Sequence, residues 1–313
     1  MILTLTLNPS LDRSIEVGSL TRGAVIRAAA AHLDPGGKGV NVSRALLANQ
    51  VRSRAVIPFG GAEGQQLVTL LAAEGIDMIS VPVAGTTRSN ITLAEPDGTV
   101  TKINEPGTAL TAAELDTLAS AVLDAAGSAD WVVASGSLPP GVPVDVYAVL
   151  CERFAGAGIQ VAVDTSGPAL VSALAAGPAL IKPNREELAE ATGTPITHVG
   201  DVIGAAGKLR AMGARSVLTS LGADGALLIE GDQVWFGTSP VEEPRSSVGA
   251  GDAMLAGFLA AGARGESALA EGLAWASAAV GLPGSRMPGP ADIDRTAVRI
   301  CTPDPALPLT PGG

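Results

Sequence analysis

The stretch from Gly249 to Asp252 places one carboxylate after two glycines, at the start of an apolar helix pattern. Glycines let backbone N–H groups converge, and a helix N-terminus favours anionic charge, so this loop could hold a transferring phosphoryl group. Asp252 could then take the proton from an attacking hydroxyl, as phosphoryl transfer to an alcohol requires. A simpler interpretation is that Asp252 is only a helix N-cap. The tetrapeptide alone leaves both interpretations open.

A second glycine-rich stretch, DPGGKGVN at residues 34–41, also precedes a helix pattern. It is not a Walker A loop, because Gly39 follows Lys38 where Ser or Thr is needed. The GAGDAM stretch is likewise no dinucleotide fingerprint, since Met254 stands in the place of the third glycine. Neither stretch therefore predicts one of the common nucleotide-binding loops.

The composition narrows the class of protein. A chain of 313 residues with 47% hydrophobic residues can bury a large core, and no apolar run approaches the roughly 18 to 20 residues that span a bilayer. The N-terminus has no basic region before its apolar run, so we expect a cytoplasmic protein without a signal peptide. Two cysteines and two histidines predict neither a disulfide scaffold nor a zinc site. The formal net charge of −11 argues against nucleic acid and anionic membranes as partners, so an anionic substrate would need a locally basic pocket.

The elements that must position these residues alternate along the chain. Strand patterns cover residues 2–7, 131–135, 160–164, 179–184, 216–220 and 225–230, and helix patterns cover 41–50, 63–75, 112–127, 202–213 and 253–263. The alternation predicts a mainly parallel sheet covered by helices, in which ligands bind beyond the carboxyl ends of the strands. Polar residues follow the apolar runs at that edge: Asn8, Asp12, Ser135, Ser137, Asp164, Lys182, Asn184, Ser220 and Gly222.

Two segments break the alternation. Residues 13–33 and 88–107 contain short alternating strand patterns, the second with Asp97-Gly98 as a hairpin turn. They could form a small antiparallel lid that keeps water from a reactive group, or they could be only an extension of the sheet edge.

Several stretches, in order along nearly the whole chain, resemble the ribokinase-like sugar kinase family. GGKGVNVSRAL at 36–46 and GAGDAMLAGF at 249–258 resemble its two signatures, and TLTLNPSLD, SGSLPPG, KPNREEL and SLGADGALL follow the order of its phosphofructokinase B branch. The resemblance implies a three-layer α/β core with a mainly parallel sheet and a small β lid, magnesium-bound ATP as the donor and a sugar hydroxyl as the acceptor. It divides the chain into a core of residues 1–12, 34–86 and 108–313 and a lid of residues 13–33 and 87–107.

The resemblance also assigns roles to the residues at matching positions. It makes Asp252 the general base and Gly249, Ala250 and Gly251 the anion hole. It places the sugar beside Asp12, Gly37, Asn41 and Ser137, the nucleotide beside Lys182, Asn184, Ser220, Gly222 and Gly225, and Mg²⁺ beside Asn184 and Glu187. Taken alone, Glu187 could be a solvated helix residue and Ser220 a turn residue. The chain departs from many relatives at Ala253, where they have Ser, and in the Pro- and Gly-rich residues 279–290, which leaves the nucleotide preference open.

Three basic residues, Arg27, Lys38 and Arg88, fall at positions that resemble the phosphate-binding ones of sugar-phosphate kinases, and such a trio is suited to an anionic ligand. Residues 35–44 and 87–107 look most like 1-phosphofructokinases, which phosphorylate fructose 1-phosphate at O6 to give fructose 1,6-bisphosphate. A 6-phosphofructokinase or a tagatose-6-phosphate kinase is the alternative, and a nucleoside or sugar kinase or a non-catalytic sugar-phosphate sensor is more remote. The resemblance further implies a homodimer formed through the lid.

Overall fold

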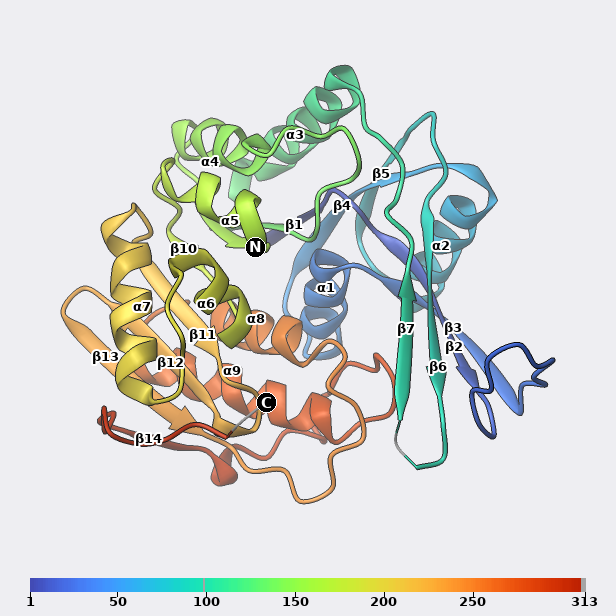
Figure 1. Cartoon of the computed structure of the whole chain (residues 1–313). Helices are drawn as coiled ribbons and strands as arrows, with labels where there is room; N and C mark the ends of the chain where they lie inside the picture. The colour runs from blue at the N-terminus through green and yellow to red at the C-terminus, as the bar shows by residue number, and fades with distance from the viewer. Residues whose placement is uncertain (98, 311–313) are drawn as a thin grey trace.

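The computed structural model describes residues 1–97 and 99–310, and a ten-stranded sheet runs through the fold (Figure 1). The strand order is β14-β13-β12-β11-β10-β9-β8-β1-β4-β5. These strands are β1 (Ile2–Thr6), β4 (Ser53–Phe59), β5 (Met78–Pro82), β8 (Trp131–Ser135), β9 (Gln160–Asp164), β10 (Leu180–Ile181), β11 (Ser216–Ser220), β12 (Ala226–Glu230), β13 (Gln233–Thr238) and β14 (Arg299–Cys301). Neighbours from β5 to β11 are parallel and those from β11 to β14 antiparallel, so the predicted mainly parallel sheet is confirmed.

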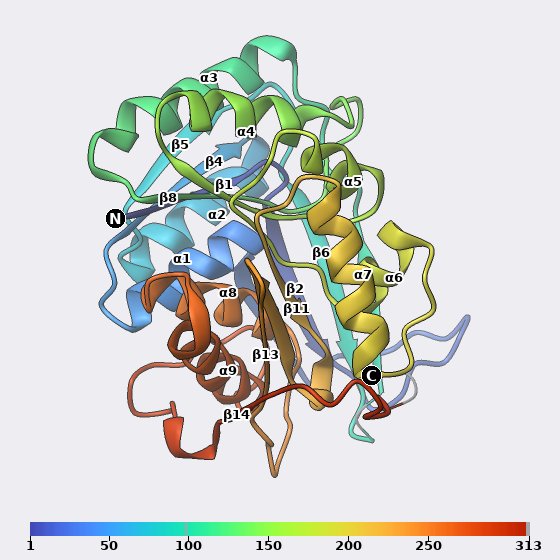
Figure 2. The ribbon, with the colours of Figure 1, turned by 90° about the vertical axis from the view of Figure 1, so that its left-hand side faces the viewer.

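Helices cover both faces of this sheet (Figure 2). They are α1 (Lys38–Ala48), α2 (Gly61–Glu74), α3 (Ala112–Ala125), α4 (Val146–Gly156), α5 (Gly167–Leu174), α6 (Arg185–Thr192), α7 (Val199–Ala211), α8 (Ala250–Ala260) and α9 (Gly265–Val280), with 3₁₀ turns η1 (Ala126–Ser128), η2 (Gly222–Asp224) and η3 (Arg295–Ala297). Leu3 and Leu5 of β1 pack with α3 to α7, whereas Ile2 packs with α1, α8 and α9. Successive side chains of a strand point to opposite faces, so β1 is apolar throughout because it is buried on both.

The described chain also contains a separate four-stranded sheet in the order β3-β2-β6-β7 (Figure 1). Its strands are β2 (Ser10–Glu16), β3 (Ala30–Gly36), β6 (Arg88–Ala94) and β7 (Val100–Asn104). This small sheet confirms the expected lid and rules out an edge extension of the main sheet. The prediction of an antiparallel lid is wrong for one pair, because β2 pairs in parallel with β6. The β6–β7 hairpin is antiparallel as predicted, while Gly98 of its predicted turn lies outside the described residues. The core and lid boundaries at 13–33 and 87–107 stay a prediction.

Helix α1 begins earlier than its pattern predicts. The apolar pattern indicated residues 41–50, whereas the helix starts at Lys38 directly after Gly37, whose φ of 117° lies in the left-handed region. A Cβ on Gly37 would also lie 2.9 Å from Thr6 Cγ2, so glycine both turns the chain and lets it approach β1. Lys38 and Asn41 are thereby placed in the first turn of one helix. Within the described residues no helix is both long enough and apolar enough to cross a bilayer.

Helices α8 and α9 pack closely because a glycine faces a tryptophan. A Cβ on Gly257 of α8 would lie 2.8 Å from Cγ of Trp275 and 2.9 Å from the carbonyl oxygen of Glu271, both on α9. Trp275 is buried and donates from Nε1 to Oε1 of Glu271 across 2.6 Å, so it has little freedom to move aside. The packing that holds α8 in place therefore depends on the missing side chain at Gly257.

Gly257→Ala is expected to lower the free energy of unfolding by about 1–3 kcal/mol, since overpacking outweighs the better helix propensity of alanine. Gly204→Ala in α7 is the matched control, because a Cβ there meets no atom within 4 Å. The control should raise the free energy of unfolding by roughly 0.5–1 kcal/mol. Urea denaturation of both variants measures the two values. A stabilised Gly257→Ala variant would contradict the packing argument.

Candidate active site

Asp252 lies in the first turn of α8 and is buried, with 7% of its surface exposed. Asn41 of α1 donates from Nδ2 to Oδ2 of Asp252 across 2.9 Å, which links two helices on the same face of the sheet. Burial and the nearby Asp164 carboxylate raise the pKa of Asp252 to about 6, against the opposing effect of Lys182 and Lys38. Asp252 is therefore a carboxylate at neutral pH and is basic enough to take a proton from a hydroxyl.

The N-cap interpretation of Asp252 is wrong. The N-cap of α8 is Gly249, whose φ of 78° lies in the left-handed region, and Asp252 follows three residues later. A Cβ on Gly249 would lie 2.7 Å from Cε of Met287, and one on Gly251 would lie 3.3 Å from Nζ of Lys182. The glycines therefore let the first turn of α8, whose N–H groups have no partners within the helix, approach a lysine closely.

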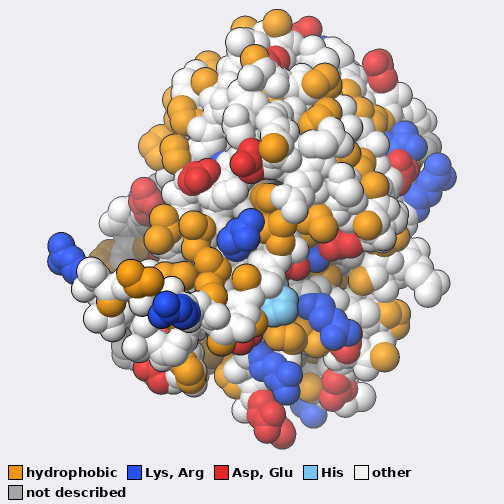
Figure 3. Space-filling view, turned by 90° about the vertical axis from the view of Figure 1, so that its right-hand side faces the viewer, with side chains coloured by type: hydrophobic (Ala, Val, Ile, Leu, Met, Phe, Trp, Pro, Cys, Tyr) orange, Lys and Arg blue, Asp and Glu red, His pale blue; other side chains and the backbone are white. Residues whose placement is uncertain are grey.

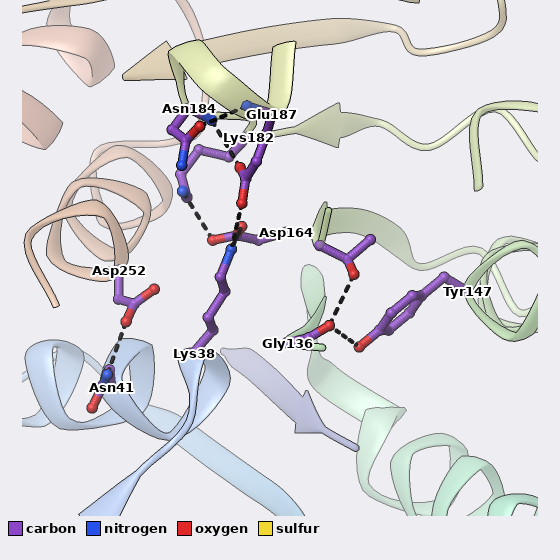
Figure 4. Close-up of polar contacts among 10 residues, drawn as sticks. Lys38, Asn41, Gly136, Tyr147, Asp164, Lys182, Asn184, Glu187 and Asp252 are labelled. Carbon is purple, nitrogen blue, oxygen red and sulfur yellow. Dashed lines mark hydrogen bonds and ion pairs between the residues drawn. The ribbon is translucent and has the colours of Figure 1, made fainter. Parts of the chain in front are cut away.

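A buried carboxylate, Asp164, stands between two lysines at the carboxyl end of β9 (Figure 4). Nζ of Lys38 lies 2.6 Å from Oδ1 of Asp164, and Nζ of Lys182 lies 3.0 Å from Oδ2. Burial works to raise the pKa of Asp164, but Lys182 and Lys38 outweigh it and hold that pKa below its ordinary value. Burial likewise works to lower the pKa of Lys38, and the Asp164 and Glu187 carboxylates reverse this and raise it. Lys38 and Asp164 therefore stay charged at neutral pH as an ion pair in which Asp164 is fully buried and the Lys38 side chain is 32% exposed.

Asn184 and Glu187 cap the start of α6 reciprocally. Oδ1 of Asn184 accepts from the backbone N–H of Glu187 across 2.8 Å, and Oε2 of Glu187 accepts from the backbone N–H of Asn184 across 2.9 Å. The other carboxylate oxygen, Oε1, lies 3.4 Å from Nζ of Lys38. Glu187 is thus a partly buried cap with an ionic partner and not a solvated helix residue.

The oxygens of this cap are the kind of ligand that Mg²⁺ prefers. Within residues 1–97 and 99–310, no three His, Cys, Asp or Glu side chains are grouped to enclose a metal ion. Mg²⁺ usually keeps several waters and takes one or two carboxylates from the protein, so Asn184 and Glu187 fit a hydrated ion.

The residues predicted to bind a nucleotide lie along the carboxyl edge of the sheet. Lys182 directly follows β10, Ser220 ends β11, and a parallel bridge joins Ser220 to Asn184. Gly222 opens η2 with a φ of 62°, and Gly225 follows η2 with a φ of 106°. A Cβ on Gly225 would strike the backbone of β13, so glycine is required there for the turn to form.

The residues predicted to bind the sugar lie where β2 meets α1 and β6. Oδ1 of Asp12 accepts from Oγ of Ser10 across 2.7 Å and from Nδ2 of Asn90 across 2.8 Å. Gly37 is close to Asp12 in the fold, because its neighbour Gly36 packs directly against the Asp12 carboxylate. These contacts fix the Asp12 carboxylate in one orientation.

Arg88 and Ser137 are joined through Asn8. Arg88 donates to the carbonyl oxygens of Asn8 across 3.0 Å and of Glu105 across 3.2 Å, while Nδ2 of Asn8 donates to Oγ of Ser137 across 3.2 Å. Nε of Arg88 is buried without a hydrogen-bond partner among the described residues. The guanidinium can therefore take one more hydrogen-bond acceptor. Burial also lowers the pKa of Arg88.

Arg27 lies apart from the other two basic residues. Strand β2 starts beside Arg88, and its seven residues, about 20 Å long, end beside the loop 17–29 that carries the exposed Arg27. Lys38 in turn points to Asp164. The three cations therefore do not converge in a single chain, because β2 separates Arg27 from Arg88 and Lys38 pairs with Asp164.

The sequence pattern places Asn8 and Asp164 at strand ends but indicates no role for them, and nothing in the pattern points to Asn90. Asn8 connects Arg88 to Ser137, and Asp164 pairs with both lysines. The available signal for Asp164 was an acid that ends a buried apolar run, since such a group needs a cationic partner.

A cavity of about 190 Å³ lies away from these polar groups. Its lining includes Gln160, Ala179 and Arg215, at the amino ends of β9, β10 and β11, together with the buried Cys151. The polar cluster is instead at the carboxyl ends of the same strands, where ligands bind in parallel sheets.

Comparison with known proteins gives one consistent result. The sequence profile of the family described as pfkB family carbohydrate kinase matches residues 5–292. The 1-phosphofructokinase of Rhodobacter capsulatus is 40% identical over 84% of this chain and 84% of its own length. The ATP-dependent 6-phosphofructokinase isozyme 2 of Escherichia coli K12 is 37% identical over 91% of this chain and 94% of its own. The crystal structure of phosphofructokinase-2 from Escherichia coli in complex with fructose-6-phosphate superposes with a TM-score of 0.86 at 35% identity, covering 93% of this chain and 96% of that one.

Asp252→Asn is expected to stabilise the fold above pH 6. The carboxyl has a pKa near 3.9 in the unfolded chain and about 6 in the folded one, so the folded state binds the proton more tightly and stability falls as pH rises between these values. Two pKa units correspond to about 3 kcal/mol, and the asparagine keeps an oxygen for the hydrogen bond from Asn41.

The unfolding free energy of Asp252→Asn should exceed that of the wild type by about 2–3 kcal/mol at pH 8, and the gain should vanish near pH 4. Urea denaturation at both pH values measures it, with Asp232→Asn at an exposed turn as the control. An equal stability of wild type and Asp252→Asn at pH 8 would show that the carboxyl has no raised pKa.

Proposed function

This chain belongs to the pfkB family of carbohydrate kinases, and we propose that it transfers the γ-phosphoryl group of ATP to the C6 hydroxyl of fructose 1-phosphate. The proposal depends above all on Asp252, a buried carboxylate with a raised pKa, in the first turn of a glycine-capped helix beside Lys182. The similarity to a 1-phosphofructokinase at 40% identity supports the choice of substrate.

In this proposal Asp252 is the general base. Its pKa of about 6 keeps it ionised at neutral pH while it remains able to accept the hydroxyl proton as the oxygen attacks phosphorus. Backbone N–H groups of Gly249, Ala250 and Gly251 form the anion hole, because the start of α8 favours negative charge. Lys182, which lies against Gly251, adds a positive charge next to the transferred group.

ATP would lie along Lys182, Asn184, Ser220, Gly222 and Gly225, which the fold aligns on one edge. The name of the Escherichia coli relative, an ATP-dependent kinase, supports this nucleotide. Asn184 and Glu187 would hold a hydrated Mg²⁺, which neutralises phosphate charge when it is bound.

The sugar would bind between α1 and the four-stranded sheet. Asp12 and Asn41 offer a carboxylate and an amide for the hydroxyls, and Gly37 lies beside them at the start of α1. Arg88 and Ser137 are the best supported phosphate ligands, because both contact Asn8 and Arg88 has an unpartnered Nε. Lys38 would bind the phosphate only if its ammonium group left the carboxylates of Asp164 and Glu187.

Fructose 6-phosphate is the second candidate substrate. Two observations favour it: the 37% identity to a 6-phosphofructokinase, and the fold match to a phosphofructokinase-2 with fructose-6-phosphate bound. The two sugars carry phosphate at opposite ends, so the same base and cations would serve either one with the sugar reversed.

We also propose a homodimer formed through the lid. Hydrophobic side chains of the lid are exposed, including Val25 at 88%, Ile103 at 54% and Val100 at 51%. The face of the molecule seen in Figure 3 carries hydrophobic side chains interspersed with basic and acidic ones. Covering such residues with a second copy removes apolar surface from water. Arg27, in the same exposed loop as Val25, would reach a phosphate ligand only in such an assembly or after a movement of the loop.

A coupled assay of ADP release with Mg²⁺ and ATP tests the proposed substrate. We expect kcat/KM for fructose 1-phosphate to exceed that for fructose 6-phosphate, tagatose 6-phosphate and free fructose by about tenfold or more, since a misplaced phosphate loses charge-assisted hydrogen bonds. Preference for a 6-phosphate would show that the sugar binds in the reversed orientation. Preference for free fructose would contradict the proposed phosphate-binding residues.

Arg88→Ala is expected to raise KM for the sugar phosphate about 10- to 100-fold, because charge-assisted hydrogen bonds contribute about 1.5–3 kcal/mol. The KM for ATP should stay within about twofold, since Arg88 lies on the lid side of the site. Arg54→Ala is the control. It breaks a partly exposed ion pair between Arg54 of β4 and Asp77, which directly precedes β5, and should change neither KM value. An unchanged sugar-phosphate KM in Arg88→Ala would exclude Arg88 as a phosphate ligand.

A further inference from the structure

The segment of residues 305–310 runs along the start of α7 and is held there by its backbone. The N–H groups of Gly200 and Val199 donate to the carbonyl oxygens of Pro305 and Leu307 across 3.0 Å each. The N–H of Leu309 donates to the carbonyl oxygen of Thr197 across 2.8 Å, and the Leu309 side chain is buried in the main core cluster. The segment is therefore a packed part of the fold up to Thr310.

Thr310 joins this segment to the loop η2. Its N–H donates to Oδ2 of Asp224 across 2.9 Å, and its Oγ1 donates to Oδ1 of Asp224 across 2.7 Å. Both oxygens of the Asp224 carboxylate are thus engaged by one residue. Asp224 lies between Gly222 and Gly225, the two glycines that shape the predicted nucleotide loop.

Thr310 is also bound to the start of α6. Arg185 donates from Nη1 to the carbonyl oxygen of Thr310 across 2.6 Å, and the same nitrogen lies 4.0 Å from Oδ2 of Asp224. Arg185 directly follows Asn184, which bridges to Ser220 at the end of β11. Thr310, Asp224 and Arg185, called here the tail junction, therefore tie the two sides of the predicted nucleotide site together.

We propose that the tail junction positions the loop η2 and the start of α6 for nucleotide binding. The inference deepens the proposed function, because it takes Gly222, Gly225 and Asn184 as the nucleotide-binding residues. Asp224 would repel the phosphates of a nucleotide if its carboxylate were free. Thr310 and Arg185 hold that carboxylate on the side of the tail, so the loop offers its backbone to the nucleotide.

Thr310→Val tests the junction, because it removes the hydroxyl bond to Asp224 with little change of shape. We expect KM for MgATP to rise about 3- to 10-fold, because the lost hydrogen bond is solvent-exposed and contributes no more than an ordinary one. The kcat and the KM for fructose 1-phosphate should stay within about twofold. Thr310→Ser keeps the hydroxyl and should restore the wild-type KM for MgATP.

Thr296→Val is the matched control. Thr296 also donates both its N–H and its Oγ1 to one carboxylate, that of Asp294, but it does so at η3, beside α9. We expect it to leave KM for MgATP unchanged. An unchanged KM for MgATP in Thr310→Val, or an equal rise in Thr296→Val, would overturn the proposal.

Direct binding separates this inference from the proposed function. Calorimetric titration with MgADP should give a Kd that is 3- to 10-fold weaker for Thr310→Val than for wild type, whatever the acceptor sugar. If wild type binds MgADP but turns over none of the sugar phosphates, the proposed function fails while the junction remains tested. If wild type turns over fructose 1-phosphate and both proteins bind MgADP equally, the junction fails alone.

Discussion

The balance of charge around buried Asp164 is the constraint on which the rest of the site depends. A carboxylate without exposed surface is stable only with cationic partners, and Asp164 has two in Lys38 and Lys182. Lys38 also meets Glu187, so two lysines offset two carboxylates. Asp252 lies beside this group with an amide as its hydrogen-bond neighbour, and burial together with the Asp164 carboxylate raises its pKa. In a chain of net charge −11, these two lysines offset the charge of Asp164 and Glu187 and so reduce the repulsion of an anionic substrate at this place.

The fold produces this balance by bringing strand ends together. Asp164 ends β9, Lys182 follows the neighbouring β10, and Lys38 opens a helix that begins where the four-stranded sheet joins the core. The residues proposed to bind the sugar lie beside the small sheet, and those proposed to bind the nucleotide lie at β11, η2 and α6. The ion pairs of Asp164 join Lys38 of the first group to Lys182 of the second. The cost is stability, because Asp252 is kept charged in the interior, as is common where a fold carries out chemistry.

The parts of this arrangement that follow local rules could be predicted from the sequence. Glycine spacing and helix pattern placed the start of α8 at residue 253, close to the observed start at Ala250, and the strand patterns located the carboxyl edge with Lys182 and Asn184 on it. Long-range contacts could not be predicted in this way. Lys38 and Asp164 are 126 residues apart, and nothing local indicates that Lys38 turns to Asp164 and away from Arg88. The separation of Arg27 from Arg88 likewise depends on strand register, and α9 escaped notice because its alanine-rich sequence is apolar on several sides.

The central claim is that Asp252 takes the proton of the acceptor hydroxyl, and turnover by Asp252→Asn tests it most directly. Steady-state kinetics with Mg²⁺, ATP and fructose 1-phosphate should give a kcat about 10²- to 10⁴-fold below wild type. Both KM values should stay close to those of the wild type, since the amide keeps the shape of the site and its contact with Asn41. A kcat near the wild-type value would contradict the assignment of Asp252 as the base.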